Sequence, residues 1–275
     1  MKRDREVLAR IADALEGMSG AASPPPDWLG SPAYVWEGQS ARPVPAIQAP
    51  PLALLRGIDA QKALVTSNIA RLAAGHAAHD MLLWGSRGMG KSALLRASIA
   101  AVQADDPASI ALVQVAPDAL SQLAPLFAAL GRENRRFLVF VDDLGFEDGD
   151  SSGPRALRSW LEGGVEARPG NVRLAVTSNR RAIVARHLSE QDDPINPRDA
   201  VDDRLALADR FGLSIGFHNC SQEDYLAIIA AYAEHHALSW DAAEALEWSK
   251  RRGARSGRVA WQFITELAGR AGKMI

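Results

Sequence analysis

The sequence predicts an α/β protein in which a mostly parallel sheet is covered by helices on both faces. Short apolar runs alternate with segments whose apolar residues recur at helical spacing, which is the pattern of strands joined by helices. One apolar run leads through a glycine-rich turn directly into a helix. Beyond Phe217 the chain shows helical patterns alone, which indicates a small helical lid on the sheet.

Five strands are expected, each bounded by polar or turn residues, and the expected helices between them show an apolar face. Ser221 is expected to cap the first lid helix, because a serine followed by acidic residues is typical of helix N-termini. The strands are expected at 81–84, 110–115, 137–141, 172–177 and 213–217. The helices are expected at 60–74, 91–103, 120–130, 154–161, 222–236, 241–251 and 257–271.

The N-terminal segment differs from the rest of the chain. Residues 7–18 carry apolar side chains at spacings of three and four, which predicts one amphipathic helix. Residues 20–51 are rich in proline and are expected to form an extended strap. Because exposed tryptophans without a partner are unusual, Trp28, Tyr34 and Trp36 are expected to pin this strap to the domain. A strap that binds a partner protein is the alternative.

Composition and charge exclude several classes of protein. The chain has 275 residues, a formal net charge of −2 and a single cysteine, Cys220. Disulfide scaffolds and cysteine-rich metal sites are therefore excluded, and a reducing compartment is indicated. No apolar run is long enough to cross a bilayer, and the small net charge gives no global attraction to nucleic acid or membranes. We expect a cytoplasmic, bacterial protein with no membrane partner.

The segment from Gly85 to Ser92 has the pattern of a phosphate-binding loop, Gly-x-x-x-x-Gly-Lys-Ser. It lies between a strand and a helix, so that backbone N–H groups of the turn and the helix point at one anion. Lys91 is expected to reach the β- and γ-phosphates of a nucleotide, and the Ser92 hydroxyl to bind magnesium. A glycine turn with a surface lysine is the alternative. The expected nucleotide-binding residues of the loop are Gly85, Ser86, Arg87, Gly88, Met89, Gly90, Lys91 and Ser92.

Two acidic residues follow the third expected strand. Asp142 and Asp143 lie at the carboxyl edge of the sheet, which is where α/β folds bind ligands. Asp142 is expected to hold magnesium through its water shell, together with Ser92. Asp143 is expected to orient or deprotonate the attacking water. The alternative is that this pair is the polar end of a buried strand.

Three further residues are candidates on position. Asn179 follows the fourth strand and is expected to hold water against the γ-phosphate, with a helix cap or turn as the alternative. Arg210 precedes the fifth strand and is expected to act on the nucleotide of a neighbouring subunit, with Arg204 as competitor and an intramolecular salt bridge as the alternative. Arg258 opens the last helix and is preferred over Arg255 as a lid residue that touches the phosphates, with a plain basic loop as the alternative.

These segments in this order resemble AAA+ ATPases and, more narrowly, the bacterial domain-of-unknown-function family 815. The resemblance covers about residues 52–272, and the segments are specific only in combination. They are Leu82-Leu-Trp-Gly-Ser-Arg-Gly-Met-Gly-Lys-Ser, Asp142-Asp-Leu-Gly-Phe-Glu, Leu161-Glu-Gly-Gly, Thr177-Ser-Asn-Arg-Arg and Asp209-Arg-Phe-Gly-Leu.

The resemblance implies a P-loop nucleotide-binding fold with a five-stranded sheet in the order 5-1-4-3-2 and a C-terminal helical lid. It also implies ATP and magnesium as ligands, often a ring-shaped homo-oligomer, and a position for Ile58 and its neighbour Gly57 against the adenine. One departure is important, because AAA+ enzymes usually carry Asp-Glu where this chain has Asp142-Asp143. Aspartate is shorter by one methylene, so slow hydrolysis is expected; Glu147 is the nearest alternative acid and Glu162 a more distant one.

The favoured hypothesis is an ATPase that couples ATP binding and hydrolysis to conformational change or oligomer assembly. The first alternative is a nucleotide-dependent binding module with little hydrolysis, and a small-molecule kinase is disfavoured. The chain divides into an N-terminal helix and strap (1–51), a nucleotide-binding α/β domain (52–219) and a lid (220–275). A further alternative is a loader that acts on nucleic acid, which the small net charge disfavours. Its contacts would be Arg132, Arg135, Arg136, Arg180, Arg181, Lys250, Arg251 and Arg252.

Overall fold

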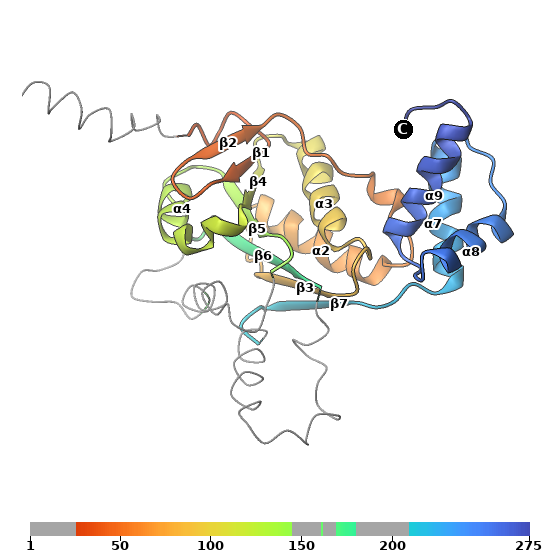
Figure 1. The fold of residues 1–275 in the computed structure, drawn as a ribbon. Coiled ribbons are helices and arrows are strands. Elements are labelled where there is room, and N and C mark those ends of the chain that lie inside the picture. The colour runs from red at the N-terminus through yellow and green to blue at the C-terminus, as the bar shows by residue number, and fades with distance from the viewer. Residues whose placement is uncertain (1–25, 145–160, 162–168, 180–208) are drawn as a thin grey trace, which may run out of the picture.

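The computed structural model describes residues 26–144, 161, 169–179 and 209–275. These residues form a twisted sheet with helices on both faces, and the C-terminal helices project as a cluster from one end (Figure 1). The helix expected at 7–18, most of the helix expected at 154–161, and the side chains of Glu147, Glu162, Arg180, Arg181 and Arg204 lie outside the described residues. In the described part, no helix is long and apolar enough to cross a membrane.

The sheet has seven strands in the order β2-β1-β4-β5-β6-β3-β7. The expectation of a sheet with only five strands was therefore wrong, since the strap adds two strands at one edge. The five expected strands keep their predicted relative order, and all their neighbour pairs are parallel. They are β3 (Met81–Gly85), β4 (Ile110–Val115), β5 (Arg136–Val141), β6 (Val172–Ser178) and β7 (Leu213–Phe217).

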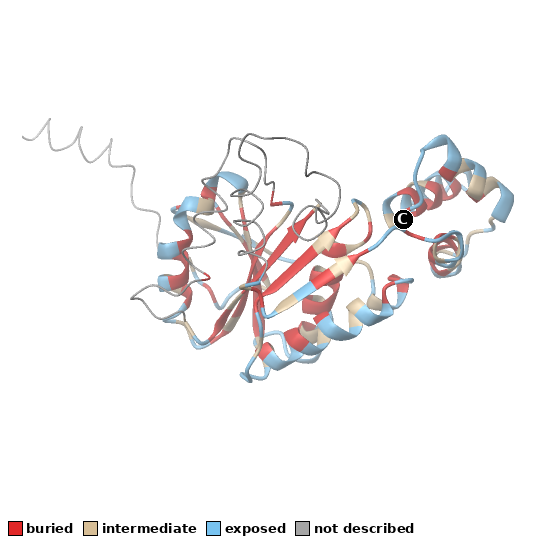
Figure 2. Cartoon of the chain, turned by 90° about the horizontal axis from the view of Figure 1, so that it is seen from below, coloured by how far each residue is buried: buried red, intermediate tan, exposed pale blue. Residues whose placement is uncertain are grey.

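Side chains alternate between two hydrophobic cores, one on each face of the sheet. In β5, Leu138 and Phe140 enter one core, while Phe137, Val139 and Val141 enter the other. Because both faces are covered, the strands are continuous apolar runs instead of alternating polar and apolar ones. Figure 2 shows the strands as a buried centre between half-exposed helices.

Different helices cover the two faces. The first core contains α2 (Asp59–Ala73) and α3 (Lys91–Asp105), whose apolar sides pack against each other and the sheet. The second core contains α4 (Leu123–Leu130), which follows the 3-10 turn η2 (Pro117–Gln122). The helix expected at 120–130 therefore begins as a tighter helix, with Pro117 at its first turn. A second such turn, η1 (Leu52–Leu54), precedes α2.

The strap extends the sheet. Strand β1 (Ala33–Trp36) pairs in parallel with β4, and β2 (Ala41–Val44) returns antiparallel to β1. The expected burial of its aromatic residues is confirmed: Trp28, Tyr34 and Trp36 are each at most 5% exposed. Trp28 packs edge-on against Tyr34 and Phe137, and the indole N–H of Trp36 donates to the Gln122 carbonyl. The strap is thus part of the second core.

One buried arginine ties this strap to the sheet. The Arg135 guanidinium is only 5% exposed and donates five hydrogen bonds to main-chain carbonyls. Three of the acceptors, at Trp28, Leu29 and Ser31, belong to the strap. The other two belong to Pro107, in the turn before β4, and to Ile110, the first residue of β4. Arg135 was proposed as a nucleic-acid contact on sequence alone; its burial excludes that role.

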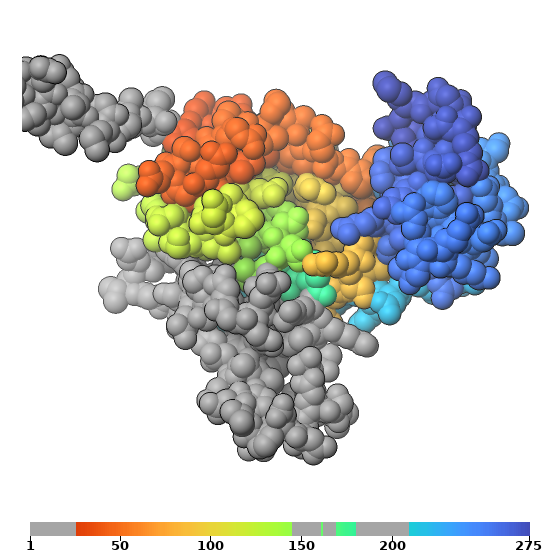
Figure 3. Space-filling model, in the orientation of Figure 1, coloured from red at the N-terminus to blue at the C-terminus, as the bar shows by residue number. Residues whose placement is uncertain are grey.

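The C-terminal helices form a compact cluster, called the lid below, which projects at one side of the molecule in Figure 3. The lid comprises α7 (Gln222–His235), α8 (Ala242–Arg251) and α9 (Gly257–Arg270). Each begins with a side-chain cap, from Ser221, Asp241 and Ser256 respectively. At Ser221 the cap is reciprocal with Asp224, which confirms the expected start of α7.

Cys220 lies buried in the turn that joins β7 to the lid. Burial raises the pKa of its thiol to about 11, and the nearby Asp224 carboxylate acts in the same direction while Arg255 opposes it. The thiol therefore stays protonated over the whole neutral range when the lid is packed in place.

Removal of the buried guanidinium tests its role as an anchor. Arg135→Met leaves five carbonyls without their charged donor, so we expect the free energy of unfolding to fall by about 3 kcal/mol in urea denaturation. Arg132→Met is the matched control because Arg132 is exposed three residues away, and it should change stability by less than about 0.5 kcal/mol. Equal denaturation midpoints for the two variants would contradict the anchor.

The reactivity of the Cys220 thiol shows whether the turn between β7 and the lid is packed. At pH 9 an unfolded thiol is about half ionised, whereas the folded one is protonated, so alkylation by iodoacetamide should be at least about tenfold slower in the folded protein. Because the folded state holds this proton up to about pH 11, stability should fall as pH rises from 9 toward 11. Equal alkylation rates in buffer and in urea would show that Cys220 is already exposed in the folded protein.

Candidate functional site

The glycine-rich loop joins the end of β3 to the start of α3, and three of its glycines have positive φ. Gly85, Gly88 and Gly90 have φ of 126°, 77° and 88°, a region that side chains rarely tolerate. A Cβ on Gly85 would also lie 2.1 Å from the Phe217 carbonyl oxygen of β7. The loop conformation therefore requires glycine at all three positions for its backbone angles, and at Gly85 also for close packing.

The N-terminus of α3 is left open for an anion. Gly90 precedes the helix without a side-chain cap, and the first turn contains no acidic residue. The N–H groups of a helix's first turn have no partners within the helix, and they carry the positive end of its dipole. The three lid helices, by contrast, are all capped by side chains. The α3 N-terminus thus fits a phosphate group.

Lys91 lies in the centre of the site and is 5% exposed. Its ammonium donates to the carbonyls of Gly85 and Ser86 at 2.8 and 2.9 Å and to the Asn179 Oδ1 at 3.0 Å. Burial lowers the pKa of Lys91, and the carboxylates of Asp143 and Asp142 oppose this shift. A negatively charged ligand in the loop would favour the charged form of Lys91 in the same way.

Asp142 is hydrogen-bonded to two hydroxyl groups from neighbouring elements. Its Oδ1 accepts from Ser92 Oγ at 2.6 Å and from Thr177 Oγ1 at 2.7 Å. A hydroxyl and a carboxylate at this distance are the kind of oxygen ligands that magnesium takes beside a phosphate, with water completing its shell. The described residues contain no group of three or more His, Cys, Asp or Glu that would hold a metal by itself. The donor set therefore fits magnesium bound together with a nucleotide.

Asp143 is held by three groups. Its backbone, with φ of 54°, donates from its N–H to Thr177 Oγ1 at 2.8 Å. Its Oδ1 accepts from the Asn179 side-chain amide, and its Oδ2 forms an ion pair with Arg87 Nη2 at 3.7 Å. The Arg87 and Asp143 side chains are 71% and 53% exposed, so this ion pair contributes at most about 1 kcal/mol.

The lid contacts the glycine-rich loop directly. The Arg258 N–H at the start of α9 donates to the Gly88 carbonyl at 3.2 Å, and the loop leaves no spare room there. A Cβ on Gly88 would lie 3.0 Å from Arg258 Cβ and from the hydroxyl of the capping Ser256. On the opposite side of the loop, Ser86 Oγ donates to Asn219 Oδ1 at 2.5 Å, in the turn before the lid.

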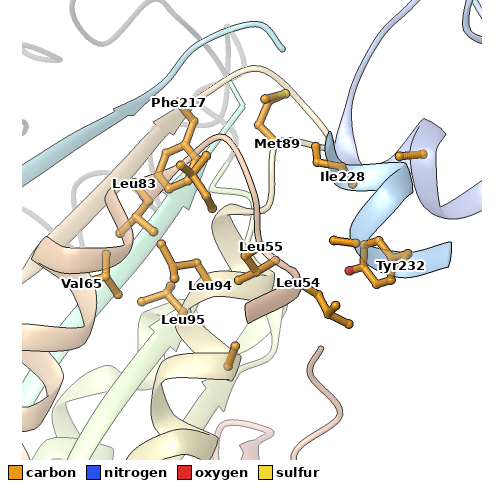
Figure 4. Close-up of a cluster of buried hydrophobic side chains, with 14 of the residues drawn as sticks. Leu54, Leu55, Val65, Leu83, Met89, Leu94, Leu95, Phe217, Ile228 and Tyr232 are labelled. Atoms are coloured by element: carbon orange, nitrogen blue, oxygen red, sulfur yellow. The ribbon is translucent and has the colours of Figure 1, made fainter. Parts of the chain in front are cut away.

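An apolar wall connects the loop to the lid. Ile58 and Met89 are 6% and 9% exposed, and the Cβ position of Gly90 is 3.7 Å from Ile58 Cδ1. In Figure 4, Met89 of the loop faces Ile228 of α7, and Leu54 lies near Tyr232 of the same helix. The first core therefore runs without interruption from the sheet into the lid.

The predicted site residues fall into three groups. The glycine-rich loop, Asp142, Asp143 and Asn179 meet at the carboxyl edge of the sheet, and Arg258 and Ile58 lie beside the loop. Arg210 lies before β7, and Gly85 pairs with Phe217 at the far end of that strand. The five residues of β7 span roughly 15 Å, so Arg210 lies at the opposite edge from the loop. Glu147 lies outside the described residues.

Sequence reasoning missed three residues of the site. Thr177 links Asp142 to the Asp143 backbone, and Asn219 and Ser256 bring the lid to the loop. Thr177 could have been predicted from the sequence, because a hydroxyl at the end of an otherwise apolar strand lies at the ligand-binding edge of the sheet. Nothing in the sequence distinguishes Asn219, since a polar residue in a turn is common.

Comparison with solved structures shows an AAA+ fold. The RuvB Holliday junction branch migration motor of Thermotoga maritima is 17% identical with a TM-score of 0.51, covering 80% of this chain and 68% of that one. Aeropyrum pernix Orc1, solved in complex with DNA, is 16% identical with a TM-score of 0.56, covering 80% of this chain and 65% of that one. At such identities the likeness is one of fold. The search of curated proteins gave no significant match.

The family comparison covers most of the chain. Residues 30–271 match the family described as "Protein of unknown function (DUF815)". The match begins before β1, so it includes residues 30–51 of the strap, which the sequence resemblance had left out. The glycine-rich loop, the strand order and the solved structures together show the fold of AAA+ P-loop ATPases. Because the family match spans most of the chain, the protein belongs to the DUF815 family.

Proposed function

We propose that this protein is a magnesium-dependent ATPase of the AAA+ type, whose nucleotide state sets the position of the lid and the contacts between subunits. The observation that carries the proposal is the convergence of Lys91, Ser92, Asp142 and Asn179, from three different elements, around one uncapped helix N-terminus. This set supplies a cation and backbone donors for phosphates, with oxygen ligands for the metal beside them.

The loop residues would bind and orient the phosphates. Lys91 now donates to two loop carbonyls and to Asn179, and it would donate to the β- and γ-phosphates when ATP is bound. Magnesium held by Ser92 and Asp142 would neutralise charge that develops on the phosphates. Ile58, with Gly57 beside it, is placed close to the loop's last glycine and would lie against the adenine.

Asp143 and Asn179 would position the attacking water. The amide of Asn179 bridges Lys91 and Asp143, so the water-orienting carboxylate is coupled to the phosphate-binding lysine. Asp143 would accept a proton from the water or hold it in line with the γ-phosphate. Its short side chain is the reason to expect slow turnover. Glu147 stays a second candidate for the acid.

The lid would respond to the nucleotide because it already contacts the loop. The Gly88 carbonyl accepts from the first turn of α9, and Ser86 is hydrogen-bonded to Asn219 in the turn before α7. Phosphates bound between the loop and Arg258 would change both contacts. We therefore propose that the lid moves when the nucleotide changes. In this proposal residues 220–275 are the lid, residues 52–219 are the nucleotide-binding domain, and residues 1–51 are an N-terminal helix and strap.

Arg210 would act on a neighbouring subunit. Its place at the opposite edge of the sheet from the loop makes it too distant for the nucleotide of its own chain. In a ring with head-to-tail contacts, one subunit's amino edge would face the next subunit's loop. The proposed assembly is therefore a homo-oligomer with shared sites, and the proposed location is the bacterial cytoplasm.

Two alternatives remain in view. A binding module that uses ATP as a structural ligand would keep every contact described above and lose only the hydrolysis. A nucleic-acid loader is favoured by the fold neighbours, one a branch migration motor and one solved with DNA. Within the chain its support is weaker, since Arg135 is buried and Arg251 and Arg252 engage Glu247 and Gln262 within the lid.

Two substitutions separate binding from hydrolysis. Lys91→Ala should weaken ATP binding by at least about a hundredfold, because it removes the buried phosphate-binding cation. Asp143→Asn should preserve ATP binding and lower turnover by about a hundredfold or more, because it removes the general base. Binding is measured by calorimetry with MgATP and turnover by phosphate release.

The outcomes distinguish the ATPase from the binding module. Absence of ATP binding by the wild-type protein would overturn the proposal. Binding with background turnover in the correctly assembled wild type would leave the binding module. Unchanged turnover in Asp143→Asn would move the role of the acid to Glu147.

Mixing of inactive variants tests the shared site. Arg210→Ala should lower turnover by about a thousandfold with ATP binding intact, as for an arginine supplied in trans. When Arg210→Ala and Asp143→Asn subunits are mixed at equal amounts, about a quarter of the sites regain both groups if contacts are head-to-tail. Recovery of turnover on mixing, with oligomeric mass measured in MgATP, supports the trans role. Two inactive variants that stay inactive when mixed in one assembly would contradict it.

A further inference from the structure

Arg87 of the glycine-rich loop carries a long side chain that pairs with Asp143, an acid of the site. It precedes Gly88 and lies on the exposed side of the loop, 71% accessible to solvent. Its guanidinium and that of Arg258 both act electrostatically on Lys91, as do the carboxylates of Asp142 and Asp143. Arg87 therefore belongs to the charged group around the phosphate position and is more than a spacer between two glycines.

The ion pair occupies the residue proposed to orient water. Asp143 Oδ1 accepts from Asn179, and Asp143 Oδ2 pairs with Arg87. While Arg87 lies at Asp143 Oδ2, its guanidinium takes up part of the space from which a water molecule could approach that oxygen. Of the two donors, Asn179 is fixed by its bond to Lys91, while Arg87 is carried on an exposed loop.

We propose that Arg87 is a positioning residue that pairs with Asp143 while no γ-phosphate is bound and turns to the γ-phosphate when ATP enters, freeing Asp143 Oδ2 for water. The inference rests on the proposed ATPase function and adds to it a group, within the loop itself, that distinguishes ATP from ADP.

Physical chemistry favours the exchange of partners. An exposed arginine–aspartate pair at 3.7 Å is weak, so little is lost when it opens. A terminal phosphate offers more charge than a carboxylate and matches the guanidinium fork with two parallel hydrogen bonds. The terminal β-phosphate of ADP would be bound by the backbone N–H groups of the loop and by Lys91, without a contribution from Arg87. Arg87 should therefore contribute to ATP affinity far more than to ADP affinity.

The experiment compares the two nucleotides in matched variants. Dissociation constants for the β,γ-imido analogue of ATP and for ADP, both with magnesium, are measured by calorimetry for wild type, Arg87→Ala and Arg87→Lys. The control is Arg251→Ala, which removes a similar exposed ion pair, Arg251 with Glu247 at 3.5 Å, from the lid surface away from the loop. Circular dichroism melting checks that every variant folds.

The expected result is a selective loss. Arg87→Ala should weaken the ATP analogue by about tenfold and ADP by less than about threefold, with Arg87→Lys between wild type and Arg87→Ala. Arg251→Ala should change neither nucleotide.

Three results would overturn the inference: equal weakening of both nucleotides, unchanged affinity for the ATP analogue, or tighter binding of it. The first would mean that Arg87 only shapes the loop, and the others that it never reaches the γ-phosphate. Failure of the proposed function looks different, because the wild-type protein would then bind neither nucleotide. If the wild type binds ATP without cutting it, the ratio of ATP to ADP affinity still tests Arg87.

Discussion

The parallel register of β3, β5 and β6 determines where the groups of the site lie. Trp84 of β3 pairs with Ser178 of β6, and Val141 of β5 pairs with Val176 of the same strand. The next residues along each strand therefore emerge together at one edge: the glycine-rich loop, Asp142 with Asp143, and Asn179. A shift of one residue would turn the alternating side chains to the opposite faces and exchange the two cores, which is why the register is firmly specified.

Charge balance within this edge depends on the buried lysine. Lys91 loses hydration on burial, and two carboxylates and three oxygen acceptors compensate for that loss. The two carboxylates have different partners. Asp142 accepts from two hydroxyls that orient it beside Ser92, whereas Asp143 is bound to an amide and an arginine that a phosphate can attract away.

The strap and the lid stabilise the sheet from opposite ends. At one end, the five hydrogen bonds of Arg135 and the aromatic cluster make the strap part of the second core. At the other end, the first core continues through Met89 into the lid. The loop that would bind phosphates therefore also packs against the lid. A ligand in the loop cannot move these atoms without altering the lid contact, because interiors are close-packed.

The sequence alone determined the five central strands, the loop and the cap at Ser221, because these depend on local periodicity and on residues with special backbone angles such as Gly88 and Gly90. Tertiary structure decided what depends on partners distant in the chain. Nothing near Arg135 in sequence shows that its guanidinium is enclosed by carbonyls of the strap and of β4, so it resembled a surface arginine. The two strap strands likewise form only because β4 offers an open edge for β1 to pair with. The pairing of Arg87 with Asp143, 56 positions apart in the printed sequence, arises from the fold alone, since only the strand register brings their two loops together.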